Sequence, residues 1–171
     1  ATFFESYFAL KVHVMIRFGR WRQIIEEPLP DDQLLWANLT ATLHYAKGVA
    51  HAALGEVQEA ETEQAKFLTA RDVMPKDRRL HNVLCLDQLA VAEAMLEGEI
   101  EYRTGNYDFA YRRLRDAVGM EDTLPYDEPW GWMQPTRHAL GALLLEQGHV
   151  DEAEAVYRED LGLGGELSRA Q

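Results

Sequence analysis

Apolar residues recur along this chain at the three- and four-residue spacing of helices that bury one face. In four places such a stretch ends at a glycine, and a second stretch of helical spacing follows it. Because glycine relieves the steric cost of the left-handed conformation that closes a helix, these glycines mark turns between paired helices. The spacing predicts helices over about 2–18, 21–25, 33–54, 56–73, 77–103, 107–118, 134–147 and 149–161, and the stretch 77–103 is either continuous or interrupted near Cys85.

A three-residue signature repeats within the pairs: a small residue, a glycine seven positions later, and an alanine five positions after that. The copies are Gly48, Gly55 and Ala60; Gly98, Gly105 and Ala110; and Gly141, Gly148 and Ala153. Gly19 marks a fourth, degenerate copy. An internal repeat decides the architecture. We therefore expect one all-α domain over 1–171, with about four helix-turn-helix repeats at about 3–28, 33–75, 77–119 and 134–161 and a loop at 120–133.

The offsets of the last copy resemble the tetratricopeptide repeat family. Leu140 and Gly141 match its Leu-Gly pair, Ala153 its later alanine and Tyr157 its later aromatic residue. The resemblance implies a right-handed superhelical solenoid whose first helices line a concave face that commonly binds a peptide. Its ligand-facing offsets fall on Ser6, Ala9, His13, Thr42, Tyr45, Val49, Ala92, Met95, Glu99, Tyr102, Arg103, Pro135, His138, Ala142 and Glu146.

Two further comparisons follow from the resemblance. The members that clamp a peptide carboxylate use Lys, Asn and Arg at these offsets, and only Arg103 would serve here, so an acidic peptide C-terminus is disfavoured. Residues 127–148, DEPWGWMQPTRHALGALLLEQG, also resemble the C-terminal part of large bacterial repeat proteins of uncharacterised role. That second resemblance implies no function.

The charge balance narrows the classes of partner. The chain carries 29 acidic and 17 basic residues, a net charge of −12 that repels phosphate backbones and anionic lipid headgroups. We therefore expect neither nucleic acid nor a membrane as partner, and no apolar run of about 18 residues predicts a membrane span. The single cysteine, Cys85, lies in an apolar run, which indicates a buried small side chain and a reducing, cytoplasmic location.

The first residues enter an apolar helix without a leader sequence, so we expect the chain to be a piece of a longer protein. In that case Phe3, Phe4, Tyr7 and Phe8 face a preceding repeat. Self-association through this aromatic N-terminal helix is a further expectation.

Chemical motifs are sparse. His44 and His51 lie seven residues apart on one helical face and could meet Glu97 or Glu101, but this spacing is not a metal motif, and interhelix hydrogen bonds are the favoured interpretation. Glu99 and Arg103 have the order of a surface ion pair. No nucleophile motif and no phosphate-binding glycine loop is present, so we expect neither an enzyme nor a cofactor.

The loop at 120–133 is the sharpest remaining feature, because it places Trp130 and Trp132 between prolines. The two indoles either line a ligand pocket beside Tyr126, Arg137 and His138 or plug the groove between the third and fourth repeats. The plug is the favoured interpretation.

Two functions remain. The first is a scaffold that binds a protein or peptide on its concave face, and the alternative is a small-molecule or metal-binding accessory domain that uses the Trp130 and Trp132 loop. An open, continuous groove would favour the first, and a closed pocket with convergent polar groups would favour the second. The candidate binding residues are Tyr45, Glu99, Tyr102, Arg103, Trp130, Trp132, Arg137 and His138.

Overall fold

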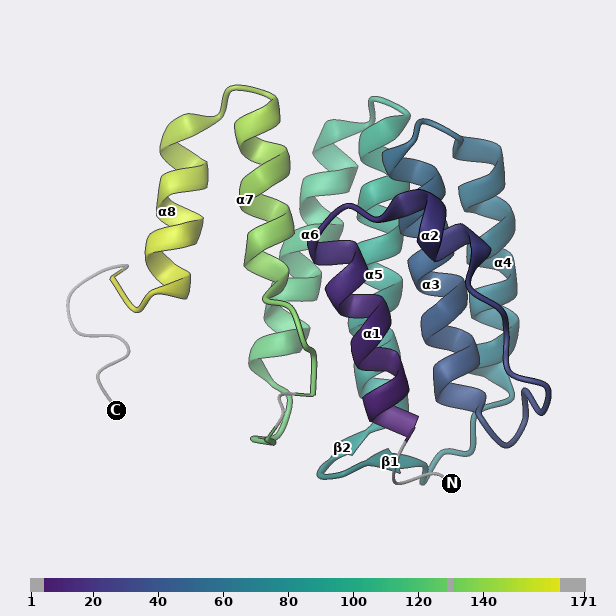
Figure 1. Ribbon diagram of the computed structural model, residues 1–171. Coiled ribbons are helices and arrows are strands. Elements are labelled where there is room, and N and C mark those ends of the chain that lie inside the picture. Colours follow the sequence, from purple (N-terminus) through teal and green to yellow (C-terminus); the bar gives the residue numbers. More distant parts are fainter. Residues whose placement is uncertain (1–4, 129–130, 164–171) are drawn as a thin grey trace.

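The computed structural model describes residues 5–128 and 131–163, and this part of the chain is mostly helical (Figure 1). It contains eight α-helices and one short β-hairpin. The helices are α1 (Glu5–Arg17), α2 (Trp21–Glu26), α3 (Ala37–Ala53), α4 (Val57–Asp72), α5 (Cys85–Arg103), α6 (Tyr107–Asp122), α7 (Thr136–Glu146) and α8 (Val150–Asp160). The strands β1 (Arg79–Leu80) and β2 (Val83–Leu84) pair antiparallel between α4 and α5.

The turn glycines have the predicted conformation. Gly19, Gly55, Gly105 and Gly148 all have positive φ angles, between 61° and 86°. Each one separates two consecutive helices, so α1 to α8 form four helical hairpins. Since an L residue with a side chain rarely adopts this conformation, glycine at these positions fixes where each helix pair turns.

Neighbouring hairpins pack on one another. In the second to fourth hairpins the first helix packs on its partner, while α3 also contacts α1, α2 and α5, and α7 contacts α6. Two hydrophobic clusters result. The larger cluster contains residues from each of the helices α1, α2, α3, α4 and α5, and it includes Phe67 and Trp132. The smaller cluster contains residues from the end of α5 and from α6, α7 and α8, around Leu144. Met95 packs against both clusters.

The repeated small residues lie where helices approach closely. A Cβ atom built on Gly48 would lie 2.8 Å from a methyl carbon of Leu96 in the next hairpin. One built on Gly98 would lie 2.8 Å from Leu114 Cγ in the paired helix α6, and one on Gly141 would lie 2.6 Å from the ring of Tyr157 in α8. These positions therefore set the distances between helices.

Gly98 and Gly119 provide a test of this packing, because both are helical glycines without strained backbone. We expect Gly98→Ala to lower the free energy of unfolding by about 1–3 kcal/mol, since the new methyl also meets the Ala110 carbonyl at 3.2 Å. Gly119→Ala should raise it by about 0.5–1 kcal/mol, because nothing lies within 4 Å of that position. Urea unfolding midpoints measure both. Equal effects of the two substitutions would contradict close packing at Gly98.

The helix predicted over 77–103 is wrong in its first part. Residues 79–84 form the β-hairpin, and α5 begins only at Cys85. His81 takes a left-handed conformation (φ 51°) at the turn, and the backbone N–H of Asn82 donates to Asp127 at 3.0 Å. Periodicity cannot distinguish a short apolar strand from a helix, and here a contact with a distant loop stabilises the strand form.

Two other boundaries differ from the prediction. The helix predicted from residue 33 begins at Ala37, because the Asp32 carboxylate accepts a hydrogen bond from Leu35 N (2.9 Å) and caps a separate turn before α3. Helix α6 continues to Asp122, so the loop before α7 spans 123–135. Cys85 is fully buried, as expected.

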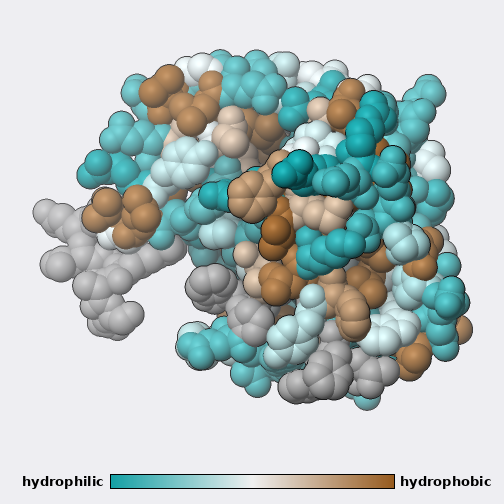
Figure 2. Space-filling view, viewed as in Figure 1, coloured by the Kyte–Doolittle hydropathy of each residue, from teal (hydrophilic) through white to brown (hydrophobic). Residues whose placement is uncertain are grey.

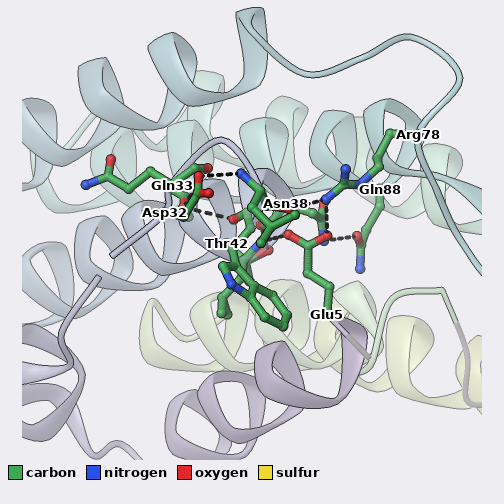
Figure 3. Close-up of polar contacts among 11 residues, drawn as sticks. Glu5, Asp32, Gln33, Asn38, Thr42, Arg78 and Gln88 are labelled. Atoms are coloured by element: carbon green, nitrogen blue, oxygen red, sulfur yellow. Dashed lines mark hydrogen bonds and ion pairs between the residues drawn. The ribbon is translucent and has the colours of Figure 1, made fainter. Parts of the chain in front are cut away.

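A buried ion pair ties α1 to the loop before the β-hairpin (Figure 3). Glu5 is 0% exposed, and its carboxylate accepts hydrogen bonds from the Arg78 guanidinium (2.8 Å) and from the backbone N–H of Leu39 (2.9 Å). A charge out of water needs such partners. These contacts fix the first helix against α3.

Helix α1 also presents an apolar outer surface (Figure 2). Tyr7, Phe8, Val14 and Phe18 are each about half exposed or more. Tyr7 and Phe8 are thus partly exposed to solvent, and their contact with a preceding repeat stays a prediction. Phe3 and Phe4 fall outside the described residues. Among the described helices, none combines the length and the apolar character that crossing a bilayer requires.

Candidate functional site

A cleft of about 290 Å³ lies at the centre of the helical hairpins, and we call it the central cleft. Helices α1, α2, α3, α5 and α7 and the loop before α7 line it. Its polar and aromatic lining consists of Arg17, Trp21, Tyr45, Glu99, Arg103, Trp132, Gln134, His138 and Glu146. Its apolar lining includes Ile16, Val49, Met95, Pro135, Ala139, Ala142 and Leu143.

Helix α1 closes one side of this cleft. In Figure 1 it lies in front of α5, between α3 and α7. Its last turn reaches α7 through Arg17, whose Nη1 lies 3.0 Å from His138 Nδ1. Gln134, just before α7, donates to the carbonyl of His13 in α1. The first and last hairpins therefore touch, and the cleft is bounded on this side instead of running on as an open groove.

Five of the eight candidate binding residues meet in the central cleft: Tyr45, Glu99, Arg103, Trp132 and His138. They come from four separate segments of the chain. Nine of the fifteen positions that the tetratricopeptide offsets placed on the ligand-facing surface line the same cleft. The first-helix offsets thus identified its α3, α5 and α7 walls.

Glu99 is the least exposed of the charged side chains that line the central cleft. Its side chain is 12% exposed, and its Oε1 accepts hydrogen bonds from Arg103 at 2.9 Å, the ion pair predicted from their spacing. Arg103 also bonds Glu146 at 3.2 Å. Burial raises the pKa of Glu99 above its usual range, although the Arg103 charge acts in the opposite direction.

Tyr45 brings a hydroxyl into the same region. The residue is 3% exposed, and its ring makes an edge contact with Trp132, with 5.4 Å between ring centroids. Burial raises the pKa of the phenol, and the nearby Glu99 charge raises it further. Within the described residues the Tyr45 hydroxyl has no hydrogen-bond partner. It therefore remains able to donate or accept a hydrogen bond in the cleft.

Trp132 is a core residue, as the favoured interpretation held, but at a different place. It is 4% exposed and belongs to the larger hydrophobic cluster. Its ring contacts His13 of α1 (5.0 Å between centroids) and Tyr45 of α3, so it fills space beside the first two hairpins and not only between the third and fourth. Trp130 lies outside the described residues.

Contacts with the β-hairpin and with α5 help to hold the loop that carries Trp132. Gln88 donates to the Gly131 carbonyl at 2.8 Å, and Asp127 accepts from Asn82 in the β-hairpin. A Cβ on Gly131 would lie 2.6 Å from Val83 Cγ2 of β2, so only glycine permits this close approach. The β-hairpin therefore helps to position the indole at the cleft.

Tyr102 and Arg137 are not among the residues that line the central cleft. Tyr102 lies in the smaller hydrophobic cluster, where its hydroxyl donates to the Leu143 carbonyl at 3.3 Å. Arg137 is 4% exposed and makes two 2.7 Å hydrogen bonds to Asp122, together with an ion pair to Glu159. Both side chains join helices to one another. Arg137 also lines a second cleft of about 290 Å³ together with Tyr126 and Trp132, as the ligand-pocket alternative predicted, whereas His138 does not line it.

Three of the polar or aromatic lining residues were missed: Arg17, Trp21 and Gln134. Trp21 occupies the position after the turn where the repeat places a packing residue, and nothing in the local pattern assigns it to a cleft. Arg17 and Gln134 become neighbours of the site only because α1 reaches α7. A sequence pattern that describes only neighbouring repeats cannot predict a contact between the first and the last helix pair.

His44 and His51 each pair with a single carboxylate. His44 Nδ1 lies 2.7 Å from Glu63, and His51 Nδ1 lies 2.7 Å from Glu56, which confirms interhelix hydrogen bonding and places neither histidine with Glu97 or Glu101. Across residues 5–128 and 131–163, no group of three or more His, Cys, Asp or Glu side chains is arranged to hold a metal ion.

His13, next to Trp132, makes stability depend on pH. Burial lowers its pKa from 6.5 to about 4. The unfolded chain therefore binds a proton between these values that the folded chain does not, so stability falls as pH falls through this window. Between pH 7 and pH 4.5 we expect the wild type to lose about 2 kcal/mol more than His13→Phe in urea unfolding. Equal losses would contradict this origin.

No protein-family model matches the chain, and no curated protein or solved structure matches it at a significant level. The tetratricopeptide resemblance therefore stays a prediction from the repeat residues.

Proposed function

We propose that the chain is a non-catalytic binding module in which the central cleft receives one side chain of a peptide from a partner protein. The observation that carries this proposal is the convergence of Tyr45, Glu99, Arg103, Trp132 and His138, from separate helices and a loop, on a single cleft. The four-repeat, right-handed superhelical architecture is part of the proposal, supported by the paired helices and their turn glycines.

The dimensions of the cleft favour one side chain over a longer peptide segment. Its volume of about 290 Å³ is at the lower limit for small-ligand sites, and α1 interrupts it on one side. At its rim Arg17 and Ala142 are exposed, so a partner can approach from solvent. The rest of the peptide would then lie on the rim.

A small molecule bound in the same cleft is the second candidate. The observation that favours it is closure by α1, which gives a bounded site with convergent polar groups instead of a continuous groove. A small ligand would be accommodated without contacts at the rim.

An array of random 12-residue peptides tests the proposal with two tryptophan variants. Ala142→Trp fills the cleft from its exposed wall, and Ala155→Trp places the same side chain on the exposed surface of α8 as a control. We expect the wild type and Ala155→Trp to bind a common set of peptides that Ala142→Trp does not bind. Retained binding by folded Ala142→Trp, or no peptide bound by the wild type, would overturn the proposal.

A further inference from the structure

The polar groups of the central cleft have unused capacity to accept hydrogen bonds. Arg103 bonds to Glu99 through Oε1 alone. Over the described part of the chain, Glu99 Oε2 accepts no hydrogen bond, and neither does the Tyr45 hydroxyl. Tyr45 as a whole is more than nine-tenths buried, and it belongs to the lining of the cleft. Neither oxygen is among the fully buried atoms that lack a partner, so both reach the open space of the cleft, where a ligand can supply the missing donor.

The lining holds two arginines and two glutamates, but the charges next to the unpaired oxygens favour a cation. Two carboxylates, Glu99 and Glu146, share the single guanidinium of Arg103, which leaves this cluster with an excess negative charge. The other arginine in the lining, Arg17, contacts His138, which in turn contacts Asp160 at 3.0 Å. The chain as a whole carries a net charge of −12, which attracts cations from solution.

Aromatic rings complete the surroundings. Trp21, Tyr45 and Trp132 all line the cleft, and Tyr45 and Trp132 meet edge to face. Ring faces attract cations and also pack against methylene groups. A ligand with a long aliphatic chain that ends in a positive charge can pack its methylene groups on the rings and place its charge at the carboxylate.

We propose that the central cleft binds the side chain of a lysine in a partner peptide, with its ammonium group at Glu99 and Tyr45. This inference rests on the proposed function and adds the chemical class of the ligand. Lysine is favoured over arginine because an ammonium is a compact charge that needs single acceptors, whereas a guanidinium is best held by both oxygens of one carboxylate. Glu99 has only one oxygen left to offer, since Oε1 is bonded to Arg103.

The experiment uses four peptides of the form acetyl-Ala-Ala-X-Ala-Ala-amide, in which X is lysine, Nζ-acetyl-lysine, norleucine or arginine, and n-butylamine as a free amine. Amide and indole NMR signals of the ¹⁵N-labelled full chain report the dissociation constant of each. We expect the lysine peptide to bind at least tenfold more tightly than the other three peptides and than n-butylamine. A norleucine or acetyl-lysine peptide that binds as tightly as the lysine peptide would overturn the inference, as would n-butylamine of equal affinity.

Two isosteric variants locate the charge that is responsible. Glu99→Gln should weaken lysine-peptide binding about tenfold, whereas Glu101→Gln should leave it unchanged, because Glu101 bonds Asn106 and does not belong to the cleft lining. Unchanged binding by Glu99→Gln would overturn the inference. If array peptides depend on Ala142 but not on their lysines, the ligand class is wrong while the proposed function stands. If array binding survives Ala142→Trp, the proposed function itself fails.

Discussion

Replacing Trp132 by alanine should lower the free energy of unfolding by about 3–5 kcal/mol. The indole is 4% exposed and contacts both α1 and α3, so its removal leaves a cavity that these two helices cannot readily close. Urea unfolding of the variant and the wild type, followed by far-ultraviolet circular dichroism, measures the difference.

Tyr126 offers a matched control in the same loop. It is 76% exposed, so Tyr126→Ala should change stability by no more than about 0.5 kcal/mol. A loss below about 1 kcal/mol for Trp132→Ala would show that the indole does not support the core. Its main contribution would then be to the lining of the central cleft.

A loss of similar size is expected for Arg78→Met, which leaves the Glu5 carboxylate buried without its counter-charge. Removing one partner of a buried ion pair costs about 3–5 kcal/mol, because the remaining charge stays out of water. Arg78 also donates to the Leu35 carbonyl at 2.6 Å, so part of the loss comes from that bond. Thermal and urea unfolding give the value.

The double variant Glu5→Gln with Arg78→Met separates the two contributions. Glutamine keeps an acceptor for the Leu39 N–H and removes the charge, so the double variant should be more stable than Arg78→Met alone. If the double variant were less stable than Arg78→Met, the buried charge would not be the source of the loss.

Much of the fold follows from local pattern. A glycine that must be left-handed is recognisable without tertiary information, and Gly55, Gly105 and Gly148 adopt that conformation. The apolar spacing also places the helices around these turns. What it does not contain is the β-hairpin at 79–84, whose Asn82 N–H is satisfied by Asp127, 45 residues later in the chain.

The site divides in the same way. Tyr45, Glu99 and His138 could be found because repeat offsets assign residues to one face of each first helix. The offsets also selected Tyr102, whose hydroxyl donates to the Leu143 carbonyl. Residues within one turn of a helix can contact different neighbouring helices, so a shared offset does not place all of them in the cleft. Arg17 and Gln134 could not be predicted, since they reach the site through a contact between the first and last hairpins.

That contact changes how the molecule should fold. Arg17 and His138 are 121 residues apart, whereas a simple repeat array has contacts only between neighbours and can unravel from either end. A contact across this separation closes a long loop and raises the contact order, so we expect it to slow folding. With Arg17 and Gln134 bonded across the cleft, helix α1 should unfold together with α7 instead of fraying first.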